Sequence, residues 1–132
     1  MIEVYADGAY ASSRDMGGWA FVVLENSEKI FSSFYPVPNT TNNRMEIQAA
    51  IEACDWCKQN NIIEFTLYTD SMYVIGTMTL NWKRKKNNDL WNRLDSLVKD
   101  ATIQWKHVKG HKGNKYNDLC DALAVQATFI TD

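Results

Sequence analysis

The 132-residue sequence has few of the residues that build zinc sites or disulfide scaffolds, with only two histidines and three cysteines. Cys54 and Cys57 have C-x-x-C spacing, but a separation of three residues also places two side chains on one face of a helix. Because both histidines lie far from this pair, no zinc site is expected, and the odd number of cysteines argues against a disulfide scaffold. These features favour a reducing compartment, the cytoplasm.

The sequence also lacks an apolar run long enough to span a membrane and the pattern of a signal peptide, so no membrane association is expected. It shows no repeat, linker or low-complexity segment. Hydrophobic residues make up 45% of the chain and charged residues 23%, as in ordinary globular domains that bury a sizeable core. We therefore expect residues 1–132 to form a single domain.

Positive charge is concentrated in one part of the chain, although the formal net charge is only −2. Residues 83–115 contain ten Lys or Arg against three acids, a local charge of +7, which leaves −9 for the remainder. A basic flank on an acidic protein suggests a polyanion held beside carboxylates. For the basic run 83–86 alone, a solvated helix end is an equally good interpretation.

Hydrophobic periodicity predicts an α/β domain. An alternating first strand ends at the turn pair Asp7-Gly8, and the next two strands should form an antiparallel hairpin. The first and fourth strands are joined through a helix, so they should run parallel. The expected strands are residues 2–7, 19–24, 29–37, 62–70 and 102–108. The expected helices begin after the N-cap candidates 40–43, at 71 (to about 86, interrupted near Gly76), after 87–89, and at 115.

Four acids stand out by their place in these elements. The first and fourth strands both end in Tyr-x-Asp, so parallel neighbours would bring Asp7 and Asp70 to one edge of the sheet. Glu46 shares a helical stripe with small apolar residues, although it could instead form a capping box with Asn43. Asp121 lies beside the packing stripe of the last helix.

Divalent cations would resolve the repulsion among such acids, because crowded carboxylates raise one another's pKa. Ligation by oxygen alone suits Mg²⁺ or Mn²⁺. Two such ions about 3.5–4 Å apart can hold the attacking and leaving oxygens of a phosphodiester in line. The residues therefore predict phosphoryl transfer by carboxylate-held metals beside a basic flank suited to phosphates.

Five segments in order closely resemble type 1 ribonuclease H: DGA (7–9), TTNNRME (40–46), YTDS (68–71), VKGH (108–111) and NDLCDALA (117–124). The resemblance spans almost the whole chain. It implies an RNase H-like α/β fold, a mixed five-stranded sheet with strands 1–3 antiparallel and strands 4 and 5 parallel to strand 1, flanked by helices. It also implies endonucleolytic hydrolysis of the RNA strand of an RNA/DNA hybrid with two Mg²⁺ ions, for which Mn²⁺ can substitute, leaving 5′-phosphate and 3′-hydroxyl ends.

The resemblance also implies roles for particular residues. The metal ligands would be Asp7, Glu46, Asp70 and Asp121, with the first bridging both ions. His111 would assist product release or proton transfer, although its glycine- and lysine-rich surroundings alone favour a solvated loop residue. His107 shares a strand face with Ile103 and Trp105, so we expect it to be structural.

Further residues are candidates for binding the substrate. Thr41 and Asn87 match positions that hold a phosphate of the DNA strand. Asn42 and Asn43 match minor-groove contacts, where 2′-hydroxyls distinguish RNA from DNA, although helix caps would explain them equally well. The full candidate set is Thr41, Asn42, Asn43, Ser71, Trp82, Lys83, Arg84, Lys85, Lys86 and Asn87.

Three departures from the family pattern lie outside the acids. Residues 10–16 replace the usual glycine- and proline-rich loop, the basic protrusion after Trp82 is short, and Asn39 stands where an arginine is expected. We therefore expect an active enzyme, and a monomer, with weaker hybrid affinity. The alternatives are a DNA-processing nuclease or integrase on the same fold, and a non-catalytic hybrid-binding module.

Overall fold

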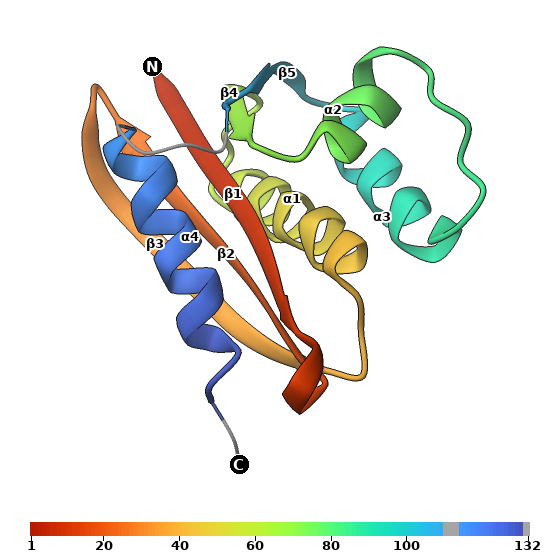
Figure 1. The fold of residues 1–132 in the computed structure, drawn as a ribbon. Helices are drawn as coiled ribbons and strands as arrows, with labels where there is room; N and C mark the ends of the chain where they lie inside the picture. The colour runs from red at the N-terminus through yellow and green to blue at the C-terminus, as the bar shows by residue number, and fades with distance from the viewer. Residues whose placement is uncertain (110–113, 131–132) are drawn as a thin grey trace.

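The computed structural model describes residues 1–109 and 114–130. Its strands are β1 (Ile2–Ala11), β2 (Met16–Glu25), β3 (Glu28–Pro38), β4 (Glu64–Thr69) and β5 (Thr102–His107). They form one sheet in the order β3-β2-β1-β4-β5 (Figure 1). β1 and β3 run antiparallel to β2, whereas β4 runs parallel to both β1 and β5. The predicted mixed sheet is confirmed.

Helices cover both faces of this sheet. They are α1 (Asn42–Gln59), α2 (Met72–Thr79), α3 (Asn88–Val98) and α4 (Lys115–Ala127). α1 packs on β1 and β2 from one side and α3 packs on α1, while α4 packs on β1 and β2 from the other side (Figure 1). The alternation along β1 serves both layers, because Val4 and Ala6 belong to the core under α1 and Tyr5 to the core under α4.

Side-chain caps fix where three of the helices begin. The hydroxyl of Thr41 accepts from the backbone N–H of Arg44 at 3.1 Å, which confirms an N-cap within residues 40–43. Ser71 caps α2 in the same way, and Asn114 caps α4. Because Thr41 is the cap of α1, the alternative capping box between Asn43 and Glu46 does not form.

β1 does not end at the turn pair Asp7-Gly8. It continues to Ala11, because every residue from Ile2 onward pairs with β2. On its other edge, however, the pairing with β4 stops at Tyr5 and Tyr68. Asp7 therefore lies where the two parallel strands cease to pair, rather than at the end of a strand.

The helix expected over residues 71–86 is shorter than predicted. α2 ends at Thr79, Asn81 adopts a left-handed conformation with φ 57°, and residues 81–86 are not helical. Gly76 does not interrupt the helix but lies within it. The Trp82 ring covers this glycine so closely that a Cβ there would lie 2.2 Å from it, and the Trp82 N–H donates to the Gly76 carbonyl. A contact with a residue six positions later thus sets the end of the helix.

The interior is apolar on both sides of the sheet. The largest fully buried side chains include those of Trp91, Met45, Ile47, Ile51, Leu67 and Leu94. Burying a side chain of this size contributes about 1.5–3 kcal/mol. Among residues 1–109 and 114–130, no helix is both long and apolar enough to cross a membrane.

Two adjacent glycines of β2 face different neighbours. A Cβ on Gly18 would lie 2.4 Å from the backbone oxygen of Ala124 and 2.7 Å from the Cβ of Ala127, both on α4. A Cβ on Gly17 would instead meet only side-chain atoms, Cγ2 of Thr40 at 2.5 Å and Cγ and Sδ of buried Met45 at 2.7 and 2.9 Å. These side chains can adjust by rotation, whereas the backbone of α4 cannot move without shifting the helix.

Gly18→Ala should therefore lower the free energy of unfolding by about 1–3 kcal/mol, the usual range for overpacking. Gly17→Ala is the matched control and should cost clearly less, because only flexible side chains must adjust. Urea unfolding of both variants followed by circular dichroism measures the difference. Equal losses in the two variants would show that the close packing of α4 on β2 is not rigid.

Candidate active site

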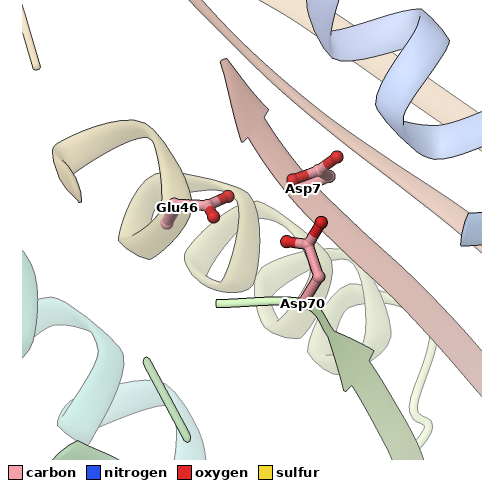
Figure 2. Close-up of side chains that lie close together, drawn as sticks. All are labelled: Asp7, Glu46 and Asp70. Carbon is pink, nitrogen blue, oxygen red and sulfur yellow. The ribbon is translucent and has the colours of Figure 1, made fainter. Parts of the chain in front are cut away.

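Three acids from separate elements meet beside the edge where β1 and β4 stop pairing. Asp7 comes from β1, Glu46 from the first half of α1 and Asp70 from the residue after β4, and each offers a carboxylate oxygen within 4.8 Å of the others (Figure 2). The parallel register aligns Tyr5 with Tyr68, so the two aspartates two residues later occupy equivalent positions. The expected meeting of Asp7 and Asp70 is thus found in the structure, and Glu46 joins them.

A glycine allows Glu46 to reach this position. The Gly8 N–H donates to Oε1 of Glu46 at 2.6 Å and to Oδ1 of Asp7 at 2.9 Å. A Cβ on Gly8 would lie 2.4 Å from the backbone carbon of Met45 and 2.5 Å from the backbone nitrogen of Glu46. The absence of a side chain at this position thus permits helix α1 to approach β1 and bring two carboxylates together.

The acids are held in an environment that opposes their ionisation. Asp7 is only 3% exposed, and its buried Oδ2 has no hydrogen-bond partner among residues 1–109 and 114–130. Burial, followed by the charges of Glu46 and Asp70, raises the pKa of Asp7. Burial and the charge of Asp70 likewise raise the pKa of Glu46, and burial raises the pKa of Asp70. A buried, unpartnered carboxylate oxygen with two further oxygen donors beside it fits a divalent cation, which would favour the ionised forms.

Asp121 lies at the margin of this cluster. It is exposed on α4 and is not one of the three acids whose oxygens lie within 4.8 Å of one another. Its carboxyl nevertheless interacts with Asp7, and this contact is among the causes that raise the pKa of Asp7. Its charge also raises the pKa of Glu46 and of Asp70.

The start of α3 is tied to the first turn of α1 by an arginine. The Arg44 guanidinium donates to both carboxylate oxygens of Asp89, at 3.0 and 2.7 Å, and to Oδ1 of Asn87 at 3.2 Å. This pair raises the pKa of Arg44 and lowers the pKa of Asp89 to about 2. Asn87, at φ 64°, also donates to the Tyr73 hydroxyl, so its amide is held from two sides.

The other candidate residues occupy several settings. Asn42 and Asn43 are exposed at the start of α1, and Trp82 is 45% exposed. Ser71 is buried, and its hydroxyl caps α2. Arg84 pairs with Asp95 of α3 and lies over the Trp91 ring, whereas Lys83, Lys85 and Lys86 are exposed. His111 lies outside the described residues.

One residue near the acids was not expected there. His107 ends β5 opposite Thr69, and its Nε2 lies 3.2 Å from the Asp70 backbone oxygen. Its charge lowers the pKa of Asp70. The pairing of β4 with β5 could have revealed this proximity, because the two parallel strands end together; the alternation within β5 alone could not.

Comparison with known proteins adds independent evidence. The RNase H family model matches residues 1–129. The chain belongs to the ribonuclease H family. It is 38% identical to a ribonuclease H from Thermoanaerobacter sp. strain X514, over 96% of this chain and 88% of that protein. It is 40% identical to a ribonuclease H from Caldanaerobacter subterraneus, over 96% of this chain and 90% of that protein.

Solved structures agree with this family in fold. The N-terminal RNase H domain of a Mycobacterium tuberculosis protein has a TM-score of 0.85 at 23% identity, covering 96% of this chain and 98% of that one. LC11-RNase H1, solved in complex with an RNA/DNA hybrid, also has a TM-score of 0.85, at 19% identity and covering 97% and 96% of the two chains. The predicted type 1 ribonuclease H fold and enzyme class are thus confirmed.

Without metal, Asp7→Asn should stabilise the protein by about 1–3 kcal/mol at neutral pH, the scale of an unsatisfied buried polar group. The folded-state pKa of Asp7 lies above the unfolded value of 3.8. The free energy of unfolding is therefore highest at low pH, where Asp7 is protonated in both states. It falls as the pH rises from about 4 toward the folded-state pKa, because the unfolded chain loses this proton first. Asparagine has no such proton to lose, so the pH slope should flatten. Urea unfolding in chelator at about pH 5, 7 and 8.5 measures both effects.

Asp100→Asn provides the charge-matched control, because Asp100 is an exposed acid outside this cluster. Its pH slope should follow that of the natural chain. Added Mg²⁺ should stabilise the natural chain more than Asp7→Asn. If all three proteins shared one pH slope in chelator, Asp7 would not carry the repulsion described above.

Proposed function

We propose that this chain is an endonuclease that hydrolyses the RNA strand of RNA/DNA hybrids with two divalent cations, Mg²⁺ or Mn²⁺, leaving 5′-phosphate and 3′-hydroxyl ends. The observation that carries the proposal is the convergence of Asp7, Glu46 and Asp70 where β1 and β4 stop pairing. Family membership supports the substrate class, and so does a neighbour of the same fold whose structure contains an RNA/DNA hybrid.

The four acids would hold the cations, with Asp7 bridging both. Its buried Oδ2 has no hydrogen-bond partner in the described part of the chain, so it is available to a cation, and its Oδ1 shares the Gly8 N–H with Glu46. Asp70 and the more exposed Asp121 would complete the set of ligands. Once bound, the cations would hold the attacking and leaving oxygens of a phosphodiester in line. In the folded chain, β1, α1 and the end of β4 position Asp7, Glu46 and Asp70, and α4 carries Asp121.

The hybrid would lie across the starts of α1 and α3. Thr41 and Asn87 would bind a phosphate of the DNA strand, since helix N-termini favour anions. The contact of Arg44 with Asn87 and Asp89 supports this proposal, because it holds the two helix starts together. Exposed Asn42 and Asn43 would lie in the minor groove and contact 2′-hydroxyls.

The basic run would extend this surface. Exposed Lys83, Lys85 and Lys86 would attract backbone phosphates, and Trp82 would present its exposed ring beside them. Ser71, next to Asp70, and Arg84, held by Asp95, complete the proposed substrate-binding set.

The remaining proposals concern the role of His111, the oligomeric state and the cellular compartment. His111 would assist product release or proton transfer. We further infer a single domain that acts as a monomer, since one chain supplies all four acids. A reducing cytoplasm is supported by the three buried free thiols Cys54, Cys57 and Cys120.

Cleavage of a labelled RNA/DNA hybrid with Mg²⁺ tests the proposal, with single-stranded RNA, duplex RNA and duplex DNA as competing substrates. Only the hybrid should be cut efficiently, and its products should carry 5′-phosphate ends. Asp7→Asn should lower turnover on the order of a hundredfold or more, while the far-ultraviolet circular dichroism spectrum stays unchanged.

Each alternative gives a different result in this assay. Efficient cleavage of duplex DNA would indicate the DNA-processing nuclease, and tight hybrid binding without turnover would indicate the binding module. Near-normal turnover by Asp7→Asn would contradict the bridging role.

Replacing Lys83, Lys85 and Lys86 together with Gln should raise KM for the hybrid. It should also lower the slope of log K against log salt by about 2–3, since each lost phosphate contact removes about 0.9. Filter binding or fluorescence anisotropy at several salt concentrations measures this slope. Replacing Lys29, Lys58 and Lys99 with Gln is the charge-matched control, because these are exposed lysines outside the basic run. An unchanged slope in the Lys83, Lys85 and Lys86 variant, or the same change in both triple variants, would show that the basic run does not contact the substrate.

A further inference from the structure

Residues 10–16, which depart from the family pattern, form a tight turn braced from within. The chain leaves β1 through one 3₁₀ turn, Ser12–Arg14, and Asp15 adopts a left-handed conformation with φ 46°. The Tyr10 hydroxyl donates to the Asp15 carboxylate at 2.7 Å, and the Asp15 N–H donates to the Ser12 carbonyl at 3.3 Å. This bracing presents the Arg14 side chain from a fixed position.

Arg14 reaches the opposite end of the chain. Its Nη2 donates to the Thr128 hydroxyl at 2.8 Å and its Nε to the Thr128 backbone oxygen at 3.4 Å. The guanidinium carbon also lies 3.9 Å from the centre of the Phe129 ring. Thr128 is only 3% exposed and ends α4, where unpaired carbonyls and the helix dipole favour a cation. Arg14 thus binds the carboxyl end of α4 through three separate contacts.

The other hydrogen bonds that restrain α4 are long or weak. At its amino end, Asn114 Nδ2 donates to the Tyr5 hydroxyl and the Tyr116 hydroxyl donates to the Ser27 carbonyl, each at 3.5 Å. Gly18 lets the backbone of Ala124 come close, and the Cys120 thiol donates to the backbone oxygens of Tyr5 and Ala20 at 3.4 and 3.3 Å. Thiols are weak donors, so these bonds oppose sliding only weakly. The charged contact at Thr128 adds a directional restraint along the helix axis.

We propose that Arg14 is a positioning residue that sets the place of Asp121 in the metal site. Asp121 lies on the same helix as Thr128, seven residues earlier, or about 10 Å along the axis. A rigid helix transmits a shift at Thr128 to Asp121, and cation–oxygen distances of about 2.0–2.1 Å for Mg²⁺ leave little tolerance for such a shift. The inference rests on the proposed role of Asp121 as a ligand.

The test is Mn²⁺ binding by titration calorimetry without nucleic acid, supported by kinetics. Arg14→Gln should weaken Mn²⁺ binding by less than the roughly tenfold or greater loss caused by removing a group that hydrogen-bonds a metal ligand directly, because Arg14 acts on Asp121 only through the helix. Turnover at limiting metal should fall and recover with excess metal, while KM for the hybrid stays unchanged. Arg14→Lys, which keeps the charge, should recover part of the affinity.

Thr128→Val removes the hydroxyl that accepts from Arg14 and donates to the Val125 carbonyl at 2.6 Å, but it keeps the backbone acceptor and the Phe129 contact. It should shift Mn²⁺ affinity in the same direction by less, which keeps the test open if Arg14→Gln folds poorly. Lys29→Gln, an exposed residue at the start of β3, is the charge-matched control and should bind Mn²⁺ normally. A lower melting temperature in Arg14→Gln with Mn²⁺ affinity equal to that control would overturn the inference, because Arg14 would then only support the fold.

Asp121→Asn separates this inference from the proposed function. If Asp121→Asn weakens Mn²⁺ binding, adding Arg14→Gln to it should cause no further loss, because both changes act on one ligand. Additive losses in the double variant would overturn the positioning role alone. Unchanged Mn²⁺ affinity in Asp121→Asn would refute its assignment as a ligand, and with it the role of Arg14.

Discussion

The site depends on the contact between helix α1 and strand β1 at Gly8. A single backbone N–H donates to carboxylates from both elements, and no other residue would permit an approach in which a Cβ would lie 2.4 Å from the Met45 backbone. This contact places Glu46 against Asp7, whose burial already opposes its charge. The fold therefore holds acids in an arrangement that disfavours their ionised forms until a cation is supplied.

The pairing of β1 with its two neighbouring strands determines where Asp7 and Asp70 lie. β1 remains paired with β2 along its whole length, so Asp7 is rigidly supported on one edge. Its pairing with β4 ends at Tyr5 and Tyr68, and the chain after β4 therefore carries Asp70 toward Asp7 without continuing the ladder. β1 thus carries one of the acids and, through its pairing with β2, also holds that acid in place.

Local pattern predicted the strands, the helix order and the meeting of Asp7 with Asp70, because alternation and strand-end spacing are properties of neighbouring residues. The complete mixed sheet and the place of Glu46 beside these aspartates came from the family resemblance, since the local pattern left a capping box open for Glu46. Local pattern did not predict that β1 continues past Gly8, since the partner that extends it lies in β2. The early end of α2 was also missed, because it depends on how Trp82 folds back over Gly76. Contacts outside the local periodicity decided each of these points, as they did for His107 beside Asp70.

Three of the arginines serve a different purpose from the three lysines of the basic run. Arg14, Arg44 and Arg84 each join two segments distant in sequence, through a guanidinium that donates several hydrogen bonds from one plane. Lys83, Lys85 and Lys86 remain exposed, as suits flexible point charges. The positively charged side chains therefore do not form one uniform surface for binding a polyanion. Changing the lysines alters the electrostatic field that a polyanion meets, whereas changing the arginines alters the scaffold on which the acids and helix starts are held.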